Sequence, residues 1–293
     1  MSESVNKKWN TFFPYLLLLP AFLYLLTILF APFIWGIGLS FTDKQIGKSF
    51  NFSGLKNYIS LLQDQVFLLS IKNTFVYTII SVAFKVLFGV IMALVLNTGI
   101  RFRSISRGLL LIPWAVPTVV SIFTWKWMFS DVGGVLNTIL LNTGLVSNKI
   151  TWLSTPAMAM LSVILVNVWR GMPFIGISVL AGLQTIPRDL YEAGTVDGAN
   201  SLQKLFYITL PSIKYVILLS TLVTTIWTFN DFEIIWLLTK GGPINTTQLI
   251  STYSYMTGIL NMNLGKAIAA SALFMPVMLI LINFVTSATL KEK

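Results

Sequence analysis

Six long apolar segments constrain the fold of this chain more than any other feature. A helix needs about 20 predominantly apolar residues to cross the hydrocarbon core of a bilayer. Charged residues make up 10% of the 293 residues and hydrophobic residues 55%, whereas a soluble domain carries about 25% charge. The sequence therefore predicts an all-α membrane protein with six transmembrane helices, at roughly 13–41, 73–96, 108–129, 156–180, 213–229 and 267–290.

The positions of the basic residues predict that both ends of the chain are cytoplasmic. Lys and Arg gather in the short cytoplasmic loops of membrane proteins, and Arg101, Arg103 and Arg107 crowd the turn between the second and third segments. Six crossings then place residues 1–12 and 291–293 in the cytoplasm, on either side of a transmembrane domain over 13–290. No small-residue cleavage site follows the first segment, so we expect it to be a retained helix.

Composition also excludes several classes of function. The formal net charge is +10, but the basic residues lie mostly at segment ends, so we expect no nucleic-acid binding. Cys and His are absent, which excludes Cys/His metal sites and Ser-His or Cys-His catalytic pairs. The phosphate-binding pattern G-x-x-x-x-G-K-[ST] fails at Gly47, because Thr42 stands at its first glycine position. We therefore expect a chain that is not an enzyme and has no metal site, ATPase site or cofactor of its own.

The stretch 184–211 is patterned as a helix, a sharp turn and a second helix. Pro187 suits the first position of a helix, and Asp189 and Glu192 lie in the first turn, where acidic side chains are favoured by the helix dipole. Gly198 suits a helix C-terminus with positive φ. The inside-positive orientation places this structure at the cytoplasmic face.

The second helix of this stretch begins at a capping box, because Asn200 is followed three residues later by Gln203. The first helix carries a small apolar face, which indicates docking into a groove of another protein. An interfacial helix lying on lipid is the alternative, although its acidic residues disfavour contact with a lipid surface. The apolar face consists of Leu190, Ala193 and Val196.

This stretch resembles the EAA loop of binding-protein-dependent ABC importer permeases, whose pattern is E-A-A, three residues, G, nine residues, I-x-L-P. Gly194 replaces the second Ala, which costs the helix about 1 kcal/mol but keeps the position small. NVWRGMPF at 167–174 and TFNDFEIIWLLTKGGP at 228–243 resemble the carbohydrate branch of this family, in particular the first permease of the maltose type. The pattern is matched by Glu192, Ala193, Gly198, Ile208, Leu210 and Pro211.

The resemblance implies a type I ABC importer permease fold in the cytoplasmic (inner) membrane of a bacterium or archaeon. It also implies four kinds of partner besides the lipid bilayer: a second homologous permease, a cytoplasmic ATPase dimer that binds ATP and Mg, an extracytoplasmic solute-binding protein and a carbohydrate. Closure of the ATPases would switch the spans between inward-open and outward-open states. The residues implied to couple to the ATPase are Glu192, Ala193, Gly194, Asp197 and Gly198.

Polar residues in and beside the fourth and fifth segments are candidates for the substrate path. Arg170 at a helix centre costs about 2.5–3.5 kcal/mol, so such a residue usually faces a cavity or a partner. Aromatic rings stack on the C–H faces of a sugar, while its hydroxyls need hydrogen-bonding groups. Arg170 could instead hold helix-end carbonyls, and Lys85 and Lys126 are interpreted as structural or snorkelling residues. By the resemblance, the sugar site is lined by Asn167, Gly171, Trp227, Thr228 and Asp231.

Two other classes of function are weighed against an importer permease. An ion-coupled secondary transporter or channel would carry acidic residues deep in several spans and inverted repeats, and no Asp or Glu lies at a predicted span centre. An intramembrane hydrolase without His or Cys would need a Ser-Lys pair or paired aspartates, and no such arrangement stands out.

By the same resemblance, Asp231 stands where the maltose permease carries an amide, so the identity of the sugar is left open.

Overall fold

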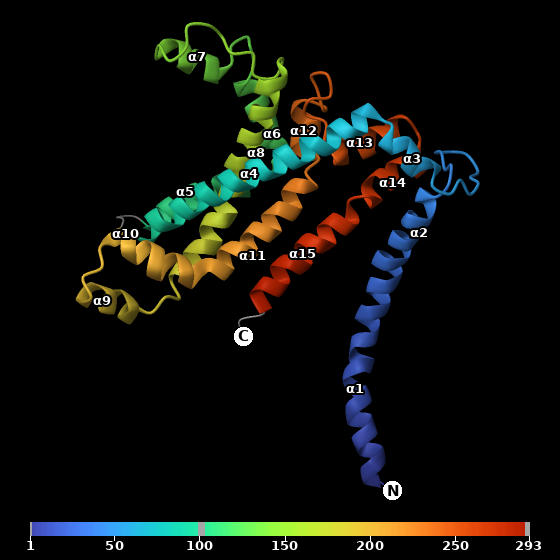
Figure 1. Ribbon diagram of the computed structural model, residues 1–293, viewed down its shortest axis with the longest axis horizontal. Helices are drawn as coiled ribbons and strands as arrows, with labels where there is room; N and C mark the ends of the chain where they lie inside the picture. The colour runs from blue at the N-terminus through green and yellow to red at the C-terminus, as the bar shows by residue number, and fades with distance from the viewer. Residues whose placement is uncertain (1, 99–102, 291–293) are drawn as a thin grey trace. The chain divides into compact units, whose positions relative to one another are not determined.

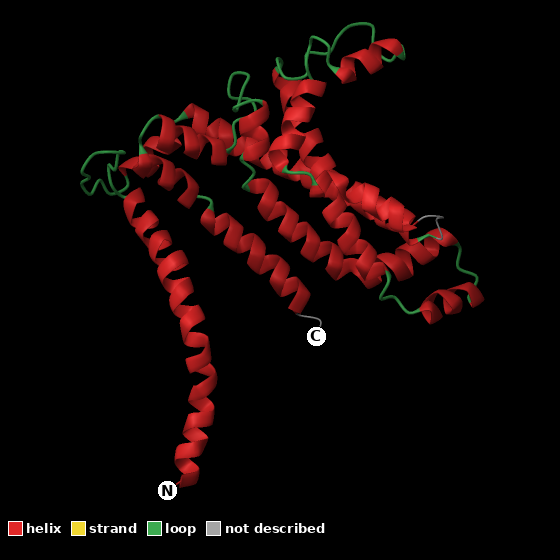
Figure 2. Cartoon of the chain, turned by 180° about the vertical axis from the view of Figure 1, so that it is seen from behind, coloured by secondary structure: helices red, strands yellow, loops and turns green. Residues whose placement is uncertain are grey.

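Helices dominate the computed structural model, which describes residues 2–98 and 103–290 (Figures 1 and 2). Arg101 and the predicted cytoplasmic end 291–293 lie outside these residues. The predicted all-α fold is confirmed, because the described residues form helices and no β-strand beyond isolated β-bridges. Five helical segments are long and apolar enough to cross a bilayer: Phe13–Ser40, Gln65–Asn97, Pro156–Leu183, Ser201–Phe229 and Leu264–Ser287.

The predicted third span is broken, so the expectation of one continuous helix over 108–129 is wrong. Helices α5 (Arg103–Ala115) and α6 (Thr118–Met128) are bent by 89° at the break. Pro117 cannot donate a backbone hydrogen bond and disfavours the α conformation of Val116 before it. Pro117 itself has ψ 134° and serves as the N-cap of α6. The pair makes a sixth span only if both helices are counted together.

Two predicted spans start earlier than their apolar runs. Helix α4 (Gln65–Asn97) begins at Gln65 because the Asp64 carboxylate accepts hydrogen bonds from the backbone N–H groups of Val66 and Phe67, at 3.0 and 3.2 Å. The fifth span runs without a break through α10 (Ser201–Lys204), a π-helical turn (Leu205–Thr209) and α11 (Leu210–Phe229). The second helix of the loop and the fifth span therefore form one continuous helical segment.

The chain folds into two compact units, of which the first comprises 1–63 and 254–273. It contains α1 (Ser2–Leu25), a π-helical turn (Leu26–Phe30), α2 (Ala31–Ser40), α3 (Lys56–Leu62) and α14 (Leu264–Ala272). Asn57 donates to the carbonyls of Ser40 and Thr42, both at 2.8 Å. A Cβ atom at Gly265 would lie 2.3 Å from the carbonyl oxygen of Thr42, so α14 packs on this turn by backbone contact.

The second unit comprises 64–253 and 274–293. Helix α4 packs along α8 (Pro156–Leu183), where glycines let the two helices approach closely. A Cβ at Gly89 would lie 2.6 Å from Cβ of Ile175, and one at Gly176 would lie 1.9 Å from Cε of Met92. This contact fixes the register of α4 against α8. The other helices introduced here are α7 (Val135–Asn142), α9 (Arg188–Val196), α12 (Glu233–Leu238), α13 (Ile250–Tyr255) and α15 (Met275–Leu290).

Candidate functional site

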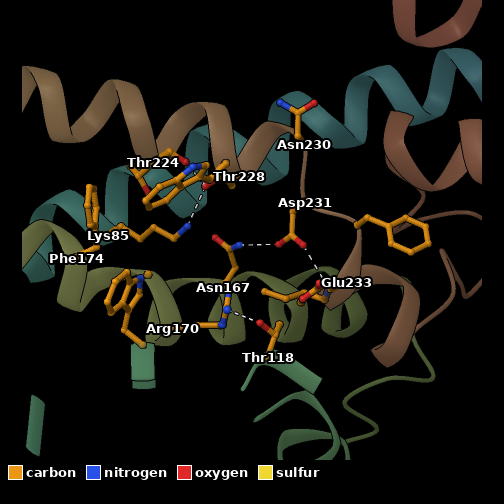
Figure 3. Close-up of a pocket in the computed structure, with 15 residues that line it drawn as sticks. Lys85, Thr118, Asn167, Arg170, Phe174, Thr224, Thr228, Asn230, Asp231 and Glu233 are labelled. Atoms are coloured by element: carbon orange, nitrogen blue, oxygen red, sulfur yellow. Dashed lines mark hydrogen bonds between the residues drawn. The ribbon is translucent and has the colours of Figure 1, made fainter. Parts of the chain in front are cut away.

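A polar cavity of about 360 Å³ lies in the second unit, where α11 ends and α12 begins beside α4 and α8 (Figure 3). Helices α5 and α6 each contribute one residue to its wall, on either side of the break at Pro117. The cavity is lined by Lys85, Trp114, Thr118, Asn167, Arg170, Gly171, Phe174, Thr224, Trp227, Thr228, Asn230, Asp231, Phe232, Glu233 and Ile234.

All six residues that the sequence assigned to the substrate path lie on this cavity. Asn167, Arg170 and Gly171 are spaced i, i+3 and i+4 on α8, which places them on one helix face. Trp227 and Thr228 belong to the last turn of α11, and the remaining residue, Asp231, comes directly after the C-cap of that helix, Asn230. The cavity is thus built from segments that are far apart in the sequence.

The carboxylate of Asp231 is held by donors from three segments of the chain. Its Oδ2 atom accepts hydrogen bonds from the Tyr77 hydroxyl of α4 at 2.6 Å and from Nδ2 of Asn167 on α8 at 2.8 Å. Its Oδ1 atom accepts from the backbone N–H of Ile234 at 3.3 Å. The Ser251 hydroxyl donates to its backbone carbonyl at 2.6 Å. Asp231 therefore fixes the end of α11 against α4 and α8.

Lys85 is a wall residue that the sequence reasoning missed. Its side chain is only 4% exposed, and its ammonium donates to the Thr228 hydroxyl at 2.9 Å, so the snorkelling interpretation is wrong. A Cβ at Gly171 would lie 2.4 Å from Cε of Lys85, so this glycine leaves the space that the lysine occupies. A lysine in mid-span is costly and marks a functional site by default, which is the signal that could have found it. Lys126 instead donates to the Leu237 carbonyl at 3.0 Å, joining α6 to α12.

Arg170 bridges α8 to the first residue of α6, because Nη2 donates to the hydroxyl of Thr118. This bond goes to a side chain rather than to the helix-end carbonyls considered as an alternative. Nε of Arg170 and Oδ1 of Asn167 are buried, and neither has a hydrogen-bond partner among the described residues. Each such group costs about 1–3 kcal/mol, so this wall retains unused hydrogen-bonding capacity.

An aromatic pair forms another part of the wall. The rings of Phe174 on α8 and Trp227 on α11 have centroids 4.8 Å apart and planes inclined at 56°. Trp227 remains 52% exposed, so part of its indole surface is available to a ligand. The cavity therefore joins an apolar ring surface to hydroxyl, amide and charged groups, which is a combination that suits a sugar.

The 184–211 loop folds as its local sequence predicts, with two corrections at its start. The expectation that Glu192 lies in the first turn is wrong, because α9 begins at Arg188 and its first turn holds Asp189 as the acidic residue. Pro187 is the N-cap of α9 rather than its first helical residue. At the other end Gly198 has φ +78°, its N–H donates to Thr195 O at 3.1 Å and the N–H of Ala199 donates to Gly194 O at 2.8 Å. These two bonds form a Schellman motif. The predicted capping box at Asn200 and Gln203 is also present.

Helix α9 packs on the following helix and leaves its apolar face exposed. A Cβ at Gly194 would lie 2.9 Å from Cδ1 of Ile208, which explains why a residue smaller than alanine fits there. Lys204 donates to the Thr195 hydroxyl at 2.7 Å and so ties the two helices together. Val196 is 89% exposed at the end of α9. Of the residues predicted to couple to an ATPase, Glu192, Ala193, Asp197 and Gly198 are exposed and Gly194 is half-buried.

Taken together, the apolar helices, the polar cavity beside them and the helix pair of the 184–211 loop define a multi-pass membrane protein of the transporter class. The family model described as "Binding-protein-dependent transport system inner membrane component" matches residues 85–291. The chain therefore belongs to this family of ABC transporter permeases, and the predicted family resemblance is confirmed.

Individual relatives agree with the family assignment. The chain is 36% identical over 242 residues to the trehalose/maltose transport system permease protein MalF of Thermococcus litoralis, covering 82% of this chain and 81% of that one. A solved bacterial ABC transporter involved in import of the acidic polysaccharide alginate matches with a TM-score of 0.81 at 26% identity, covering 98% and 99% of the two chains. The alginate transporter in complex with an alginate pentasaccharide-bound periplasmic protein matches with a TM-score of 0.80, at 26% identity and 97% and 95% coverage. The type I importer permease fold is thus confirmed.

Proposed function

We propose that this permease forms, together with a second homologous permease, the membrane path for a sugar or oligosaccharide. The observation that carries the proposal is the cavity itself, where the exposed indole of Trp227 faces into the same space as the amide of Asn167 and the hydroxyl of Thr228. A relative named for trehalose and maltose supports a carbohydrate cargo. The structure of an alginate transporter with its loaded periplasmic protein supports delivery by an extracytoplasmic binding protein.

We further propose that the 184–211 loop transmits the action of a separate cytoplasmic ATPase dimer, which binds the ATP and Mg. Support comes from the build of the loop: α9 is fixed to the next helix by the Lys204–Thr195 bond and ends at a defined turn. Its exposed apolar residues Leu190 and Val196 suit a groove in a partner. An N-in, C-in orientation in the inner membrane would put this loop on the ATPase side.

Retention of the ATPase by the purified permease tests this coupling. Val196→Glu puts a charge on the docking face, and we expect the variant to lose the ATPase during purification while the permease pair still assembles. Val132→Glu is the matched control, because Val132 is similarly exposed at 85% and lies in the turn after α6. If Val196→Glu retained the ATPase as well as the control does, the loop would not be the docking element.

Uptake into proteoliposomes tests the whole proposal. Vesicles that hold both permeases and the ATPase are expected to accumulate labelled oligosaccharide only when ATP and the binding protein are both supplied. The alternative, an ion-coupled secondary transporter or channel, predicts uptake driven by an ion gradient without ATP. Such ATP-independent uptake would refute the importer assignment.

A further inference from the structure

The inner wall of the cavity carries two cationic side chains, Lys85 and Arg170, and the nearby Asp231 carboxylate interacts with Lys85 through its charge. Lys85 is buried, and within the described part of the chain its ammonium makes one hydrogen bond, to the Thr228 hydroxyl. An ammonium has three donors, so two remain for a ligand. The guanidinium of Arg170 is anchored to Thr118 on the same cavity and adds a second positive charge.

The cavity also has two acidic residues, of which Asp231 already accepts several hydrogen bonds and Glu233 is exposed. The Asp231 carboxylate already accepts hydrogen bonds from the Tyr77 hydroxyl, the Asn167 amide and the backbone N–H of Ile234. Glu233 is exposed, in the first turn of α12. Asp231 therefore offers little further accepting capacity at the inner wall, whereas Lys85 keeps unused donors there.

The side chain of Lys85 lies where Gly171, on the neighbouring helix α8, leaves space for it. A Cβ at Gly171 would lie 2.8 Å from Nζ of Lys85 and 2.9 Å from Cδ, so the lysine stem passes directly over this glycine. Figure 3 shows the stem reaching across the cavity wall from α4 toward Thr228. Because Gly171 has no side chain, the Lys85 stem can pass over it and place the ammonium at the cavity wall beside Thr228.

We propose that the cavity selects a sugar bearing an anionic group, which binds at Lys85 with the charge of Arg170 beside it. A buried cation is costly unless it is paired and hydrogen-bonded. Asp231 compensates part of the charge of Lys85 from nearby, and an anionic substituent would add a direct hydrogen bond to the ammonium, whose bond among the described residues goes to the neutral Thr228 hydroxyl. The anion can be the carboxylate of a uronic acid or the phosphate of a sugar phosphate. This inference rests on the proposed sugar-path function and deepens it by naming the charge of the cargo.

Direct binding to the assembled transporter, without the binding protein, tests the selectivity of the cavity itself. The probes are a neutral glucose oligosaccharide, a uronic-acid oligosaccharide of equal length and a hexose phosphate, with binding measured by calorimetry in nanodiscs. Charge-assisted hydrogen bonds are worth about 1.5–3 kcal/mol, so we expect at least one anionic probe to bind roughly tenfold or more tightly than the neutral one. The better of the two anionic probes identifies the source of the charge.

Lys85→Met should abolish the preference for the anionic probe. Lys126→Met removes the same charge outside the cavity and should leave that preference unchanged. Gly171→Ala keeps the charge but displaces the ammonium, so it should reduce the preference even if Lys85→Met fails to assemble. Equal binding of neutral and anionic probes, or an equal loss for both in these variants, would overturn the inference while leaving a sugar path standing. Failure of every sugar to bind would instead count against the proposed function.

Discussion

Replacing Gly198 is the sharpest test of how the loop after α8 works. This glycine has φ +78° at the C-terminal end of α9, and a Cβ there would meet no atom within 4 Å. A Cβ atom therefore causes no clash at this position, and the cost of adding it comes from the backbone conformation. That cost is about 1–2 kcal/mol for an L-residue in the left-handed region, and a β-branched residue such as Val lies at the upper end.

A change of this size shifts the turn between its native and open forms by a factor of about 5–30. Gly198→Val should thus leave the cavity and the spans intact but weaken the Schellman bonds from the N–H groups of residues 198 and 199. If α9 must be held at this angle to engage the ATPase, sugar-stimulated ATP hydrolysis and uptake should fall together. Binding of sugar to the cavity should be unchanged.

Gly198→Asn is the matched control, because Asn tolerates the left-handed region better than other residues with a Cβ. ATP hydrolysis and uptake are measured in proteoliposomes that contain equal amounts of each assembled transporter. The expected order of activity is wild type, then Asn, then Val. Equal uptake by the Val variant and the wild type would refute the claim that this turn geometry matters for coupling.

Three further predictions concern the second unit. Gly89→Ala forces a Cβ to within 2.6 Å of Cβ of Ile175 on α8 and should destabilise the α4–α8 pair by about 1–3 kcal/mol, measured as a lower Tm. The control Gly36→Ala, whose Cβ would meet no atom within 4 Å, should leave the Tm unchanged. Trp227→Ala removes the indole surface of the cavity and should weaken sugar binding roughly tenfold; unchanged affinity in calorimetry would exclude stacking there. Tyr77→Phe removes one donor to Asp231 and should cost about 1–3 kcal/mol of stability, and an unaltered Tm would show that this bond is dispensable.

Local features of the loop could be predicted from sequence because their interactions stay within a few residues. The Gly198 turn uses bonds from residues 198 and 199 to residues 195 and 194, and the capping box joins Asn200 to Gln203. Such bonds depend on residue type and spacing alone. The shift of Pro187 to the N-cap is an error of one position, the usual scale for a helix boundary.

The break in the third span shows where local reasoning reaches its limit. Pro117 made an interruption foreseeable, but the 89° angle depends on what α6 packs against. The bond from Arg170 of α8 to Thr118 and that from Lys126 to the carbonyl of Leu237 hold α6 in place. Neither partner can be identified from the spacing of residues within α6.

The membrane class, the approximate spans and the helix–turn–helix pattern of the 184–211 loop could be predicted from the amino-acid order, since they depend on the length of apolar runs and on contacts between near neighbours. The place of Lys85 in the cavity, and the room that Gly171 leaves for it, could be seen only in the folded chain. A cavity wall is assembled from helices that are distant in the sequence. Whether a lysine in mid-span reaches water, lipid or a ligand space is set by the packing of those helices.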